Sequence, residues 1–214
     1  MASTALSAQG SILQIATGTG GAKTITAIAV GNPTIITSAA HGLNNGDVVA
    51  VAGVTGADAA LINGFSWVVT NKTTNTFAVQ LDSTGKTLTA SGTATPNTYT
   101  AIANVKTFTG FDGSSSEIDK TNLSSAAKEF SLGLVDPGHF TVEMDQDLGD
   151  AGQLALRAAQ ASGATKSFKL ILPAGTTPTA SFNALVKKVS SQGGVDAIVK
   201  SSAELRITGA ITWA

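Results

Sequence analysis

Residues 139–145 read HFTVEMD, and their alternation indicates the fold class of the second half of the chain. Successive side chains of an extended chain point to opposite faces. Here one face is apolar and the other carries Thr141, Glu143 and Asp145. The same alternation recurs in residues 202–212, where Ala203, Leu205 and Ile207 form the apolar set. This pattern predicts an antiparallel sheet with one buried face and one face toward water or a polar channel.

Around this stretch, the chain is a series of short segments rich in β-branched residues, separated by turn formers such as Asn63-Gly64. We expect strands over 11–17, 25–30, 34–38, 47–52, 66–71, 76–81, 88–93, 100–110, 128–133, 139–145, 167–172, 180–190 and 200–213. Phe65, Trp67 and Phe77 are expected to fill the core of the first half. The sequence therefore predicts a mainly β protein.

Charge divides the chain into two parts. It has 14 acidic and 13 basic residues, and only six of these 27 precede Tyr99, namely Lys23, Asp47, Asp58, Lys72, Asp82 and Lys86. We interpret this as two units of different character. The predicted boundaries are a first segment 1–23, an inserted domain 24–98 and a second domain 99–214.

One helix is expected, over Asp150–Ser162. Asp147 or Asp150 can cap its first turn, and Gly163 suits the left-handed residue that ends a helix. Leu154, Ala155, Ala158 and Ala161 form an apolar stripe at helical spacing. We expect this stripe to lie on the sheet.

A long polar segment lies between Phe111 and Lys128 and reads FDGSSSEIDKTNLSSAAK. It is too long for a simple hairpin loop, and loops of this length are usually functional or disordered. Ile118 and Leu123 are apolar anchors within it. We therefore expect the segment to become ordered against a partner.

Composition excludes several classes of function. A formal net charge of −1 gives no reason for tight nucleic-acid binding, and the absence of cysteine excludes disulfides and thiol catalysis. No run approaches the ~20 apolar residues of a membrane helix, so no membrane insertion is expected. Charged residues make up only 13%, against about 25% in typical soluble domains. Such a surface suits a subunit that is buried against copies of itself.

No arrangement for catalysis or metal binding is visible. His41 and His139 lie in separate turns and suit local hydrogen bonds. The acids Glu143, Asp145, Asp147 and Asp150 lack the calcium-loop pattern, and a strand end followed by a helix cap explains them better. There is no nucleophile elbow and no phosphate-binding loop. We therefore expect a protein that is not an enzyme and has no metal or cofactor.

Six stretches in order carry a resemblance: SEIDKTNLSS (116–125), AKEF (127–130), GLVDPG (133–138), DAGQ (150–153), GGVD (193–196) and ELRITG (204–209). This ordered set resembles the major tail proteins, or tail tube proteins, of long flexible-tailed bacteriophages. The resemblance covers 99–214, with residues 11–17 as the first strand. It implies a tail-tube β-sandwich or barrel sheet with one flanking α-helix.

The middle of the chain resembles a second, unrelated module. Residues 38–49 (SAAHGLNNGDVV), 53–56 (GVTG), 61–64 (LING) and 75–77 (NTF) are similar to a small β-barrel found in phage structural proteins and in ubiquitin-activating enzymes. This resemblance implies an inserted small all-β barrel domain and no ubiquitin chemistry.

The tail-tube resemblance implies a virion protein whose hexameric rings stack into the conduit for genome ejection into the host. Its partners would be further copies, the tape measure protein, and the tail terminator and tip proteins. DNA would pass through the tube without specific binding. The protein would be located in the virion of a siphophage, and in the host cytoplasm during assembly. The implied inter-ring loop holds Asp112, Glu117, Ile118, Asp119, Leu123 and Lys128, and the candidate lumen-facing acids are Glu143, Asp145 and Glu204.

A carbohydrate- or cell-surface-binding β module is the alternative function. Exposed Thr, Asn and aromatic side chains of the inserted domain could bind sugars. Trp67, however, is flanked by Phe65 and Val69 in an expected strand, and core packing is its favoured use.

Overall fold

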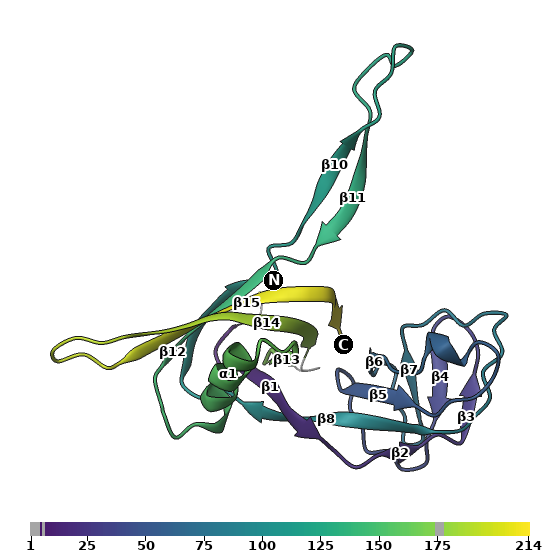
Figure 1. Ribbon diagram of the computed structural model, residues 1–214, viewed down its shortest axis with the longest axis horizontal. Coiled ribbons are helices and arrows are strands. Elements are labelled where there is room, and N and C mark those ends of the chain that lie inside the picture. Colours follow the sequence, from purple (N-terminus) through teal and green to yellow (C-terminus); the bar gives the residue numbers. More distant parts are fainter. Residues whose placement is uncertain (1–4, 6, 174–177) are drawn as a thin grey trace. The chain divides into compact units, whose positions relative to one another are not determined.

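The computed structural model describes residues 5, 7–173 and 178–214. Strands take up 49% of the described residues and helices 7%, which confirms the mainly β fold class. Among the described residues the strands form open antiparallel sheets without a closed barrel. The chain divides into two compact units (Figure 1), and each is described by itself.

Unit 1 holds Met1–Ile102, Ser167–Phe182 and Ile211–Ala214. One of its sheets follows the order β6-β5-β8-β1-β13, with β2 beside β8, and a second sheet follows β3-β4-β7. The bounds are β1 (Ile12–Thr19), β2 (Lys23–Thr24), β3 (Ala27–Ala29), β4 (Thr34–Thr37), β5 (Val48–Ala52), β6 (Ser66–Val68), β7 (Thr76–Val79), β8 (Thr93–Ala101) and β13 (Lys166–Ile171), with a 3-10 turn η1 at Ala59–Leu61.

The part of unit 1 between β2 and β8, which we call the inserted module, has a core of its own. Ile36 and Phe77 from one sheet and Val49 and Val51 from the other are fully buried in the same apolar cluster. Trp67 packs against that cluster and donates its indole N–H to the carbonyl of Ile62 at 3.1 Å. Phe65 is 54% exposed, so its expected place in the core is wrong. Its ring instead meets the edge of Trp67.

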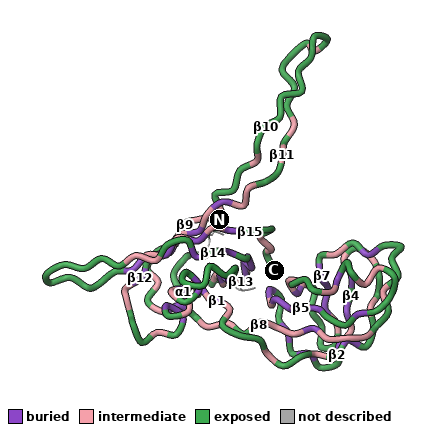
Figure 2. Tube along the Cα trace, in the orientation of Figure 1, coloured by how far each residue is buried: buried purple, intermediate pink, exposed green. Residues whose placement is uncertain are grey.

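Unit 2 holds Ala103–Lys166 and Asn183–Ala210. Its strands follow the order β14-β15-β12-β9, and β10 and β11 form a separate two-stranded sheet. The bounds are β9 (Val105–Gly110), β10 (Ser114–Asp119), β11 (Phe130–Asp136), β12 (His139–Asp145), β14 (Thr179–Gln192) and β15 (Lys200–Trp213), with α1 at Ala151–Ser162. Figure 2 shows that β10 and β11 are exposed along most of their length.

The expected alternation is present in β12 and β15. Phe140, Val142 and Met144 are buried on one face, as are Ala203 and Leu205 of the neighbouring strand. The register places Val142 opposite Ala203 and Phe140 opposite Leu205. Directly opposed residues of an antiparallel pair share a face, so these side chains form one continuous apolar surface.

Two expected strands and one expected loop differ from the structure. The one expected at 88–93 is absent except for Thr93, because Gly92 takes φ +80° and lies too close to the Ala52 carbonyl for any side chain. The one expected at 100–110 is broken, because Asn104 takes the left-handed conformation between β8 and β9. The segment 111–128, expected as a loop, contains β10.

The helix buries a different face from the one expected. Gly152, Gln153, Leu156 and Ala159 are its buried residues, while Leu154 is 48% exposed. The cause is the Gln153 side chain, which donates to the carbonyls of Ala103 (3.1 Å) and Asp145 (2.9 Å) and accepts from the N–H of Asp147. These bonds satisfy backbone groups that would otherwise be unpaired, and they turn the Leu154 stripe outward.

A buried ion pair fastens the inserted module to β13. The ammonium group of Lys169 pairs with Asp47, and the side chains are 7% and 25% exposed. Lys169 also lies over the ring of Tyr99, with Nζ 4.3 Å from its centroid. Burial raises the pKa of the Tyr99 hydroxyl, which shares a hydrogen bond with Ser167. Next to this pair, Ser181 donates to the carbonyl of Gly46 at 2.8 Å.

We expect Asp47→Asn to lower the free energy of unfolding by about 2–4 kcal/mol, because it leaves the Lys169 charge buried without its partner. Urea denaturation measures the change. Asp58→Asn is the matched control, since Asp58 pairs with Lys86 at the surface, where an ion pair contributes under about 1 kcal/mol. Equal losses in the two variants would contradict the role assigned to Lys169.

Candidate functional site

The polar face of unit 2 carries the three acids expected to line a lumen, and each has a partner. Glu143 accepts a hydrogen bond from the Thr107 hydroxyl at 3.2 Å. Asp145 pairs with Lys106 and Glu204 pairs with Lys187, both at 2.9 Å. The hydrogen bond from Lys187 lowers the pKa of the Glu204 carboxyl. Two of the three carboxylates are therefore neutralised by a lysine, whereas Glu143 is held by a neutral hydroxyl.

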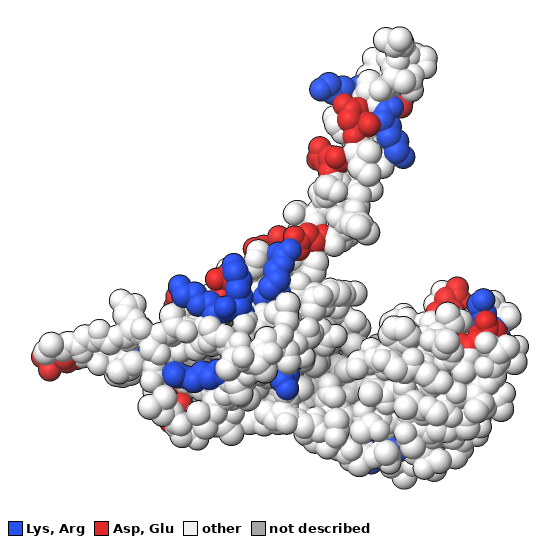
Figure 3. Space-filling model, in the orientation of Figure 1, with Lys and Arg blue, Asp and Glu red and all other residues white. Residues whose placement is uncertain are grey.

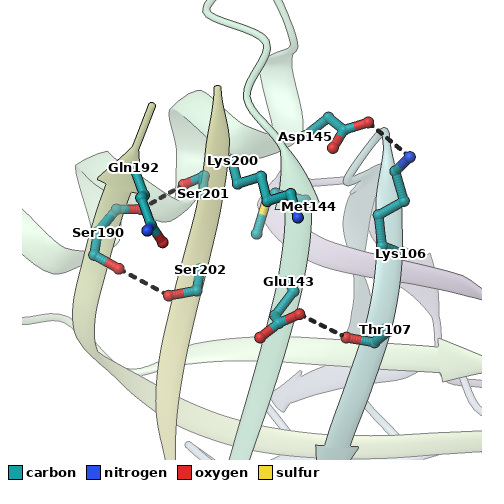
Figure 4. A pocket seen from close by; sticks show the side chains of 10 residues that line it. All are labelled: Lys106, Thr107, Glu143, Met144, Asp145, Ser190, Gln192, Lys200, Ser201 and Ser202. Atoms are coloured by element: carbon teal, nitrogen blue, oxygen red, sulfur yellow. Dashed lines mark hydrogen bonds and ion pairs between the residues drawn. The ribbon is translucent and has the colours of Figure 1, made fainter. Parts of the chain in front are cut away.

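At one end of this face lies a pocket of about 440 Å³, lined by Lys106, Thr107, Glu143, Met144, Asp145, Ser190, Gln192, Lys200, Ser201 and Ser202 (Figure 4). Its hydroxyl groups bond to one another, with Ser190 and Ser202 at 2.8 Å, and Ser201 donates to the Ser190 carbonyl at 2.9 Å. No histidine or cysteine lines it. The pocket offers paired charges rather than a nucleophile with an adjacent base.

The acids that follow β12 accept hydrogen bonds at and just before the amino end of α1. Asp150 is the N-cap, and its carboxylate accepts from the N–H groups of Gln153 (2.7 Å) and Ala103 (3.3 Å). Asp147 lies just before the helix and accepts from Gly149 N–H at 2.8 Å. Gly163 ends the helix with φ +63°. Within the described residues, no group of three or more acids, histidines or cysteines is arranged to hold a metal.

The residues expected in an inter-ring loop lie on and beside the β10–β11 hairpin. Glu117, Ile118 and Asp119 belong to β10, and Leu123 and Lys128 lie in the turn beyond it. Ile118 is 49% exposed and Leu123 is fully exposed. Asp112 lies at the base, where its carboxylate accepts from His139 N–H at 2.6 Å.

Sequence reasoning missed the most apolar part of this hairpin. Phe130, Leu132 and Leu134 alternate along β11 and are 53%, 72% and 93% exposed. The register with β10 shifts by one residue between Ser115 and Glu117, so Leu132 shares a face of the ribbon with Val135, which is 70% exposed, and Leu134 lies on the opposite face. The alternation FSLGL beside a polar segment was the available signal, but the sequence predicted only a strand at 128–133 and assigned no role to its apolar side chains.

A network of charges holds the hairpin at its base. Asp136 accepts from Gly138 N–H at 2.9 Å and from the Arg206 guanidinium at 2.6 Å. Arg206 also contacts His139 Nε2 at 3.3 Å. The Gly138 hydrogen bond, followed by Arg206, lowers the pKa of Asp136, and the His139 N–H lowers that of Asp112. In the inserted module, the second histidine, His41, is buried between Leu43 N–H and the Thr76 carbonyl.

Carboxyl NMR titration should give midpoints for Asp112 and Asp136 below the ordinary aspartate value of about 3.9. A lowered folded pKa means that these bonds stabilise the hairpin base above that value and are lost as the pH falls through the folded pKa. Arg206→Gln should raise the pKa of Asp136 more than the pKa of Asp112. Of these two carboxylates, only Asp136 bonds directly to Arg206. Equal shifts would contradict this geometry.

Figure 3 shows that most of the visible surface of the inserted module is uncharged, whereas acidic and basic groups are interspersed on unit 2. In the described part of the chain, no helix has the length and apolarity to cross a membrane.

Comparison with known proteins identifies the family. Residues 68–214 match the family described as phage tail tube, TTP, lambda-like. A comparison with curated proteins gives no match. A similar solved chain comes from a cryo-EM structure of the anti-feeding prophage (AFP) baseplate, with a TM-score of 0.44 and 12% identity over 55% of this chain and 84% of that one. The family match covers more than half of the chain, and the chain therefore belongs to the lambda-like phage tail tube proteins.

Proposed function

We propose that the protein forms hexameric rings that stack into the tail tube of a siphophage, and that the tube is the conduit for genome ejection. The observation that carries this proposal is the exposed hairpin β10–β11. An isolated two-stranded hairpin is at best marginally stable in water, and this one exposes Phe130, Leu132 and Leu134. A ribbon of this kind gains stability only when another molecule covers it.

The unpaired edge of β9 supports ring formation. β9 is the last strand in its sheet, next to β12. A free edge presents unpaired N–H and C=O groups to another chain, and closing sheets into a barrel removes such edges. We propose that the open sheet of each copy contributes to one barrel in the ring.

The paired acids support a channel through which DNA slides. A wall dense in unpaired lysines would hold the phosphate backbone, whereas Lys106 and Lys187 are each paired with a carboxylate. We propose that Glu143, Asp145 and Glu204 face the lumen. The tape measure protein inside the tube and the terminator and tip proteins at its ends are the proposed partners, in the virion and, during assembly, in the host cytoplasm.

The inserted module supports the alternative of sugar binding only weakly. Trp67 packs on the core and bonds to Ile62, so Phe65 is the exposed ring of the pair. We propose instead that the module is an insertion, with boundaries at 24–98, in a tube protein formed by segments 1–23 and 99–214.

Cryo-EM of the purified protein at high concentration should show hollow tubes with sixfold symmetry. Replacing Ser115–Val135 by a two-residue Asn-Gly turn should leave the subunit folded, because Ser114 and Asp136 are cross-strand partners. The variant should no longer form stacked tubes, since it lacks the ribbon. Tubes of normal length from this variant, or a wild-type protein that stays monomeric even with tail tips added as nuclei, would refute the proposal.

Excision of 25–92 should leave tube formation intact. Lys23 and Thr24 pair with Ala94 and Thr93, so a two-residue turn can join the ends. Lys169 would then be exposed to water rather than buried without Asp47. Circular dichroism checks the fold and electron microscopy the tubes. A folded variant that forms no tubes would make the module part of the ring contact.

A further inference from the structure

The outward face of α1 is apolar, which is the reverse of an ordinary surface helix. Ala151, Leu154, Ala158 and Ala161 are exposed, and their spacing places them on one stripe along the helix. Arg157, one turn from Leu154, is half-buried, and its Nη2 is a buried atom without a hydrogen-bond partner among the described residues. The helix face lacks an apolar cover, and the guanidinium at its side has no ion pair among the described residues.

One face of the β10–β11 hairpin has the complementary character. Its apolar row is Phe130, Leu132 and Val135, and the register places Asp119, Glu117 and Ser115 opposite them in that order. Directly opposed residues share a face, so two carboxylates flank the apolar row. Glu117 makes no ion pair within the described residues.

The two faces also agree in length. The row from Phe130 to Val135 lies opposite Asp119 to Ser115 and spans ~13 Å at about 3.3 Å per strand residue. Ala151 to Ala161 spans ~15 Å at about 1.5 Å per helix residue. The alanines leave room for the larger side chains of the ribbon to approach the helix closely.

We infer that the hairpin of one copy packs its row of Phe130, Leu132 and Val135 on the Leu154 face of α1 in a second copy, with Glu117 beside Arg157. Both faces are exposed in the same chain, so neither covers the other within one molecule. A contact between two different patches of one chain repeats from copy to copy and builds rings or filaments. The inference rests on the proposed self-assembly and names the surface that receives the hairpin.

Cysteine cross-linking tests this contact, and the chain has no cysteine of its own. Tubes of Leu132→Cys/Leu154→Cys should give a ladder of covalent multimers on mild oxidation, while each single variant should give no ladder. Ile118→Cys/Leu154→Cys is the matched control, because Ile118 lies on the opposite face of the ribbon. We expect at least about tenfold less cross-linking in the control, because residue 118 faces away from the contact.

Charge reversal provides the second readout. Glu117→Arg and Arg157→Glu should each slow assembly by about tenfold, and the double variant should recover most of the rate, as expected for directly coupled residues. Circular dichroism confirms that each variant is folded. Tubes that form without the 132–154 cross-link, or a double variant no faster than the singles, would overturn the inference while leaving the tube function intact. Failure of the wild type to assemble would overturn the tube function itself.

Discussion

A two-stranded ribbon cannot bury its own side chains, and this constraint governs unit 2. In the β14-β15-β12-β9 sheet, Phe140 and Val142 of β12 lie beside Leu205 and Ala203 of β15. In β10–β11 the same alternation has no second layer, and Leu134 is almost fully exposed. The base of the ribbon is nevertheless well fixed, by hydrogen bonds that the carboxylates of Asp112 and Asp136 accept from backbone N–H groups. A firm base with an uncovered apolar row is what a segment requires if its partner is another molecule.

The inserted module, unlike the ribbon, buries its own apolar side chains. It has its own core, and β2 and β8 enter and leave it as a directly paired couple. Such a geometry allows an insertion without disturbing the host sheet, because the ends are already at hairpin distance. The module is nevertheless not a loosely tethered appendage. The Asp47–Lys169 pair and the Ser181–Gly46 hydrogen bond join it to strands that come more than 100 residues later.

The sequence was sufficient for the features that depend on local periodicity. The alternation in β12 and β15 predicts their buried and polar faces, and the positions of Asp150 and Gly163 predict the ends of α1. It was insufficient where a residue far away in the sequence determines how a side chain packs. Nothing local indicates that Gln153 would bond to Ala103 and Asp145 and so turn the helix, or that Phe65 would lie outside the module core while Trp67 lies against it. The lysine partners of Asp145 and Glu204 also come from neighbouring strands, so the neutralisation of these two acids depends on register rather than on composition.

The exposed helix face and the exposed ribbon have one physical origin. Backbone groups next to α1 require the amide of Gln153, and satisfying them fixes the rotation of the helix, so Leu154 points to solvent. The alternation of β11 likewise fixes Leu132 on one face of a ribbon that has no layer above it. In a monomer, both arrangements expose apolar area at a cost of about 25 cal/mol per Å². A chain with only 13% charged residues does little to offset that exposure. Covering the α1 face and the β11 ribbon would therefore contribute favourable free energy to assembly. The hydrogen bonds of the folded subunit hold both surfaces in their exposed positions.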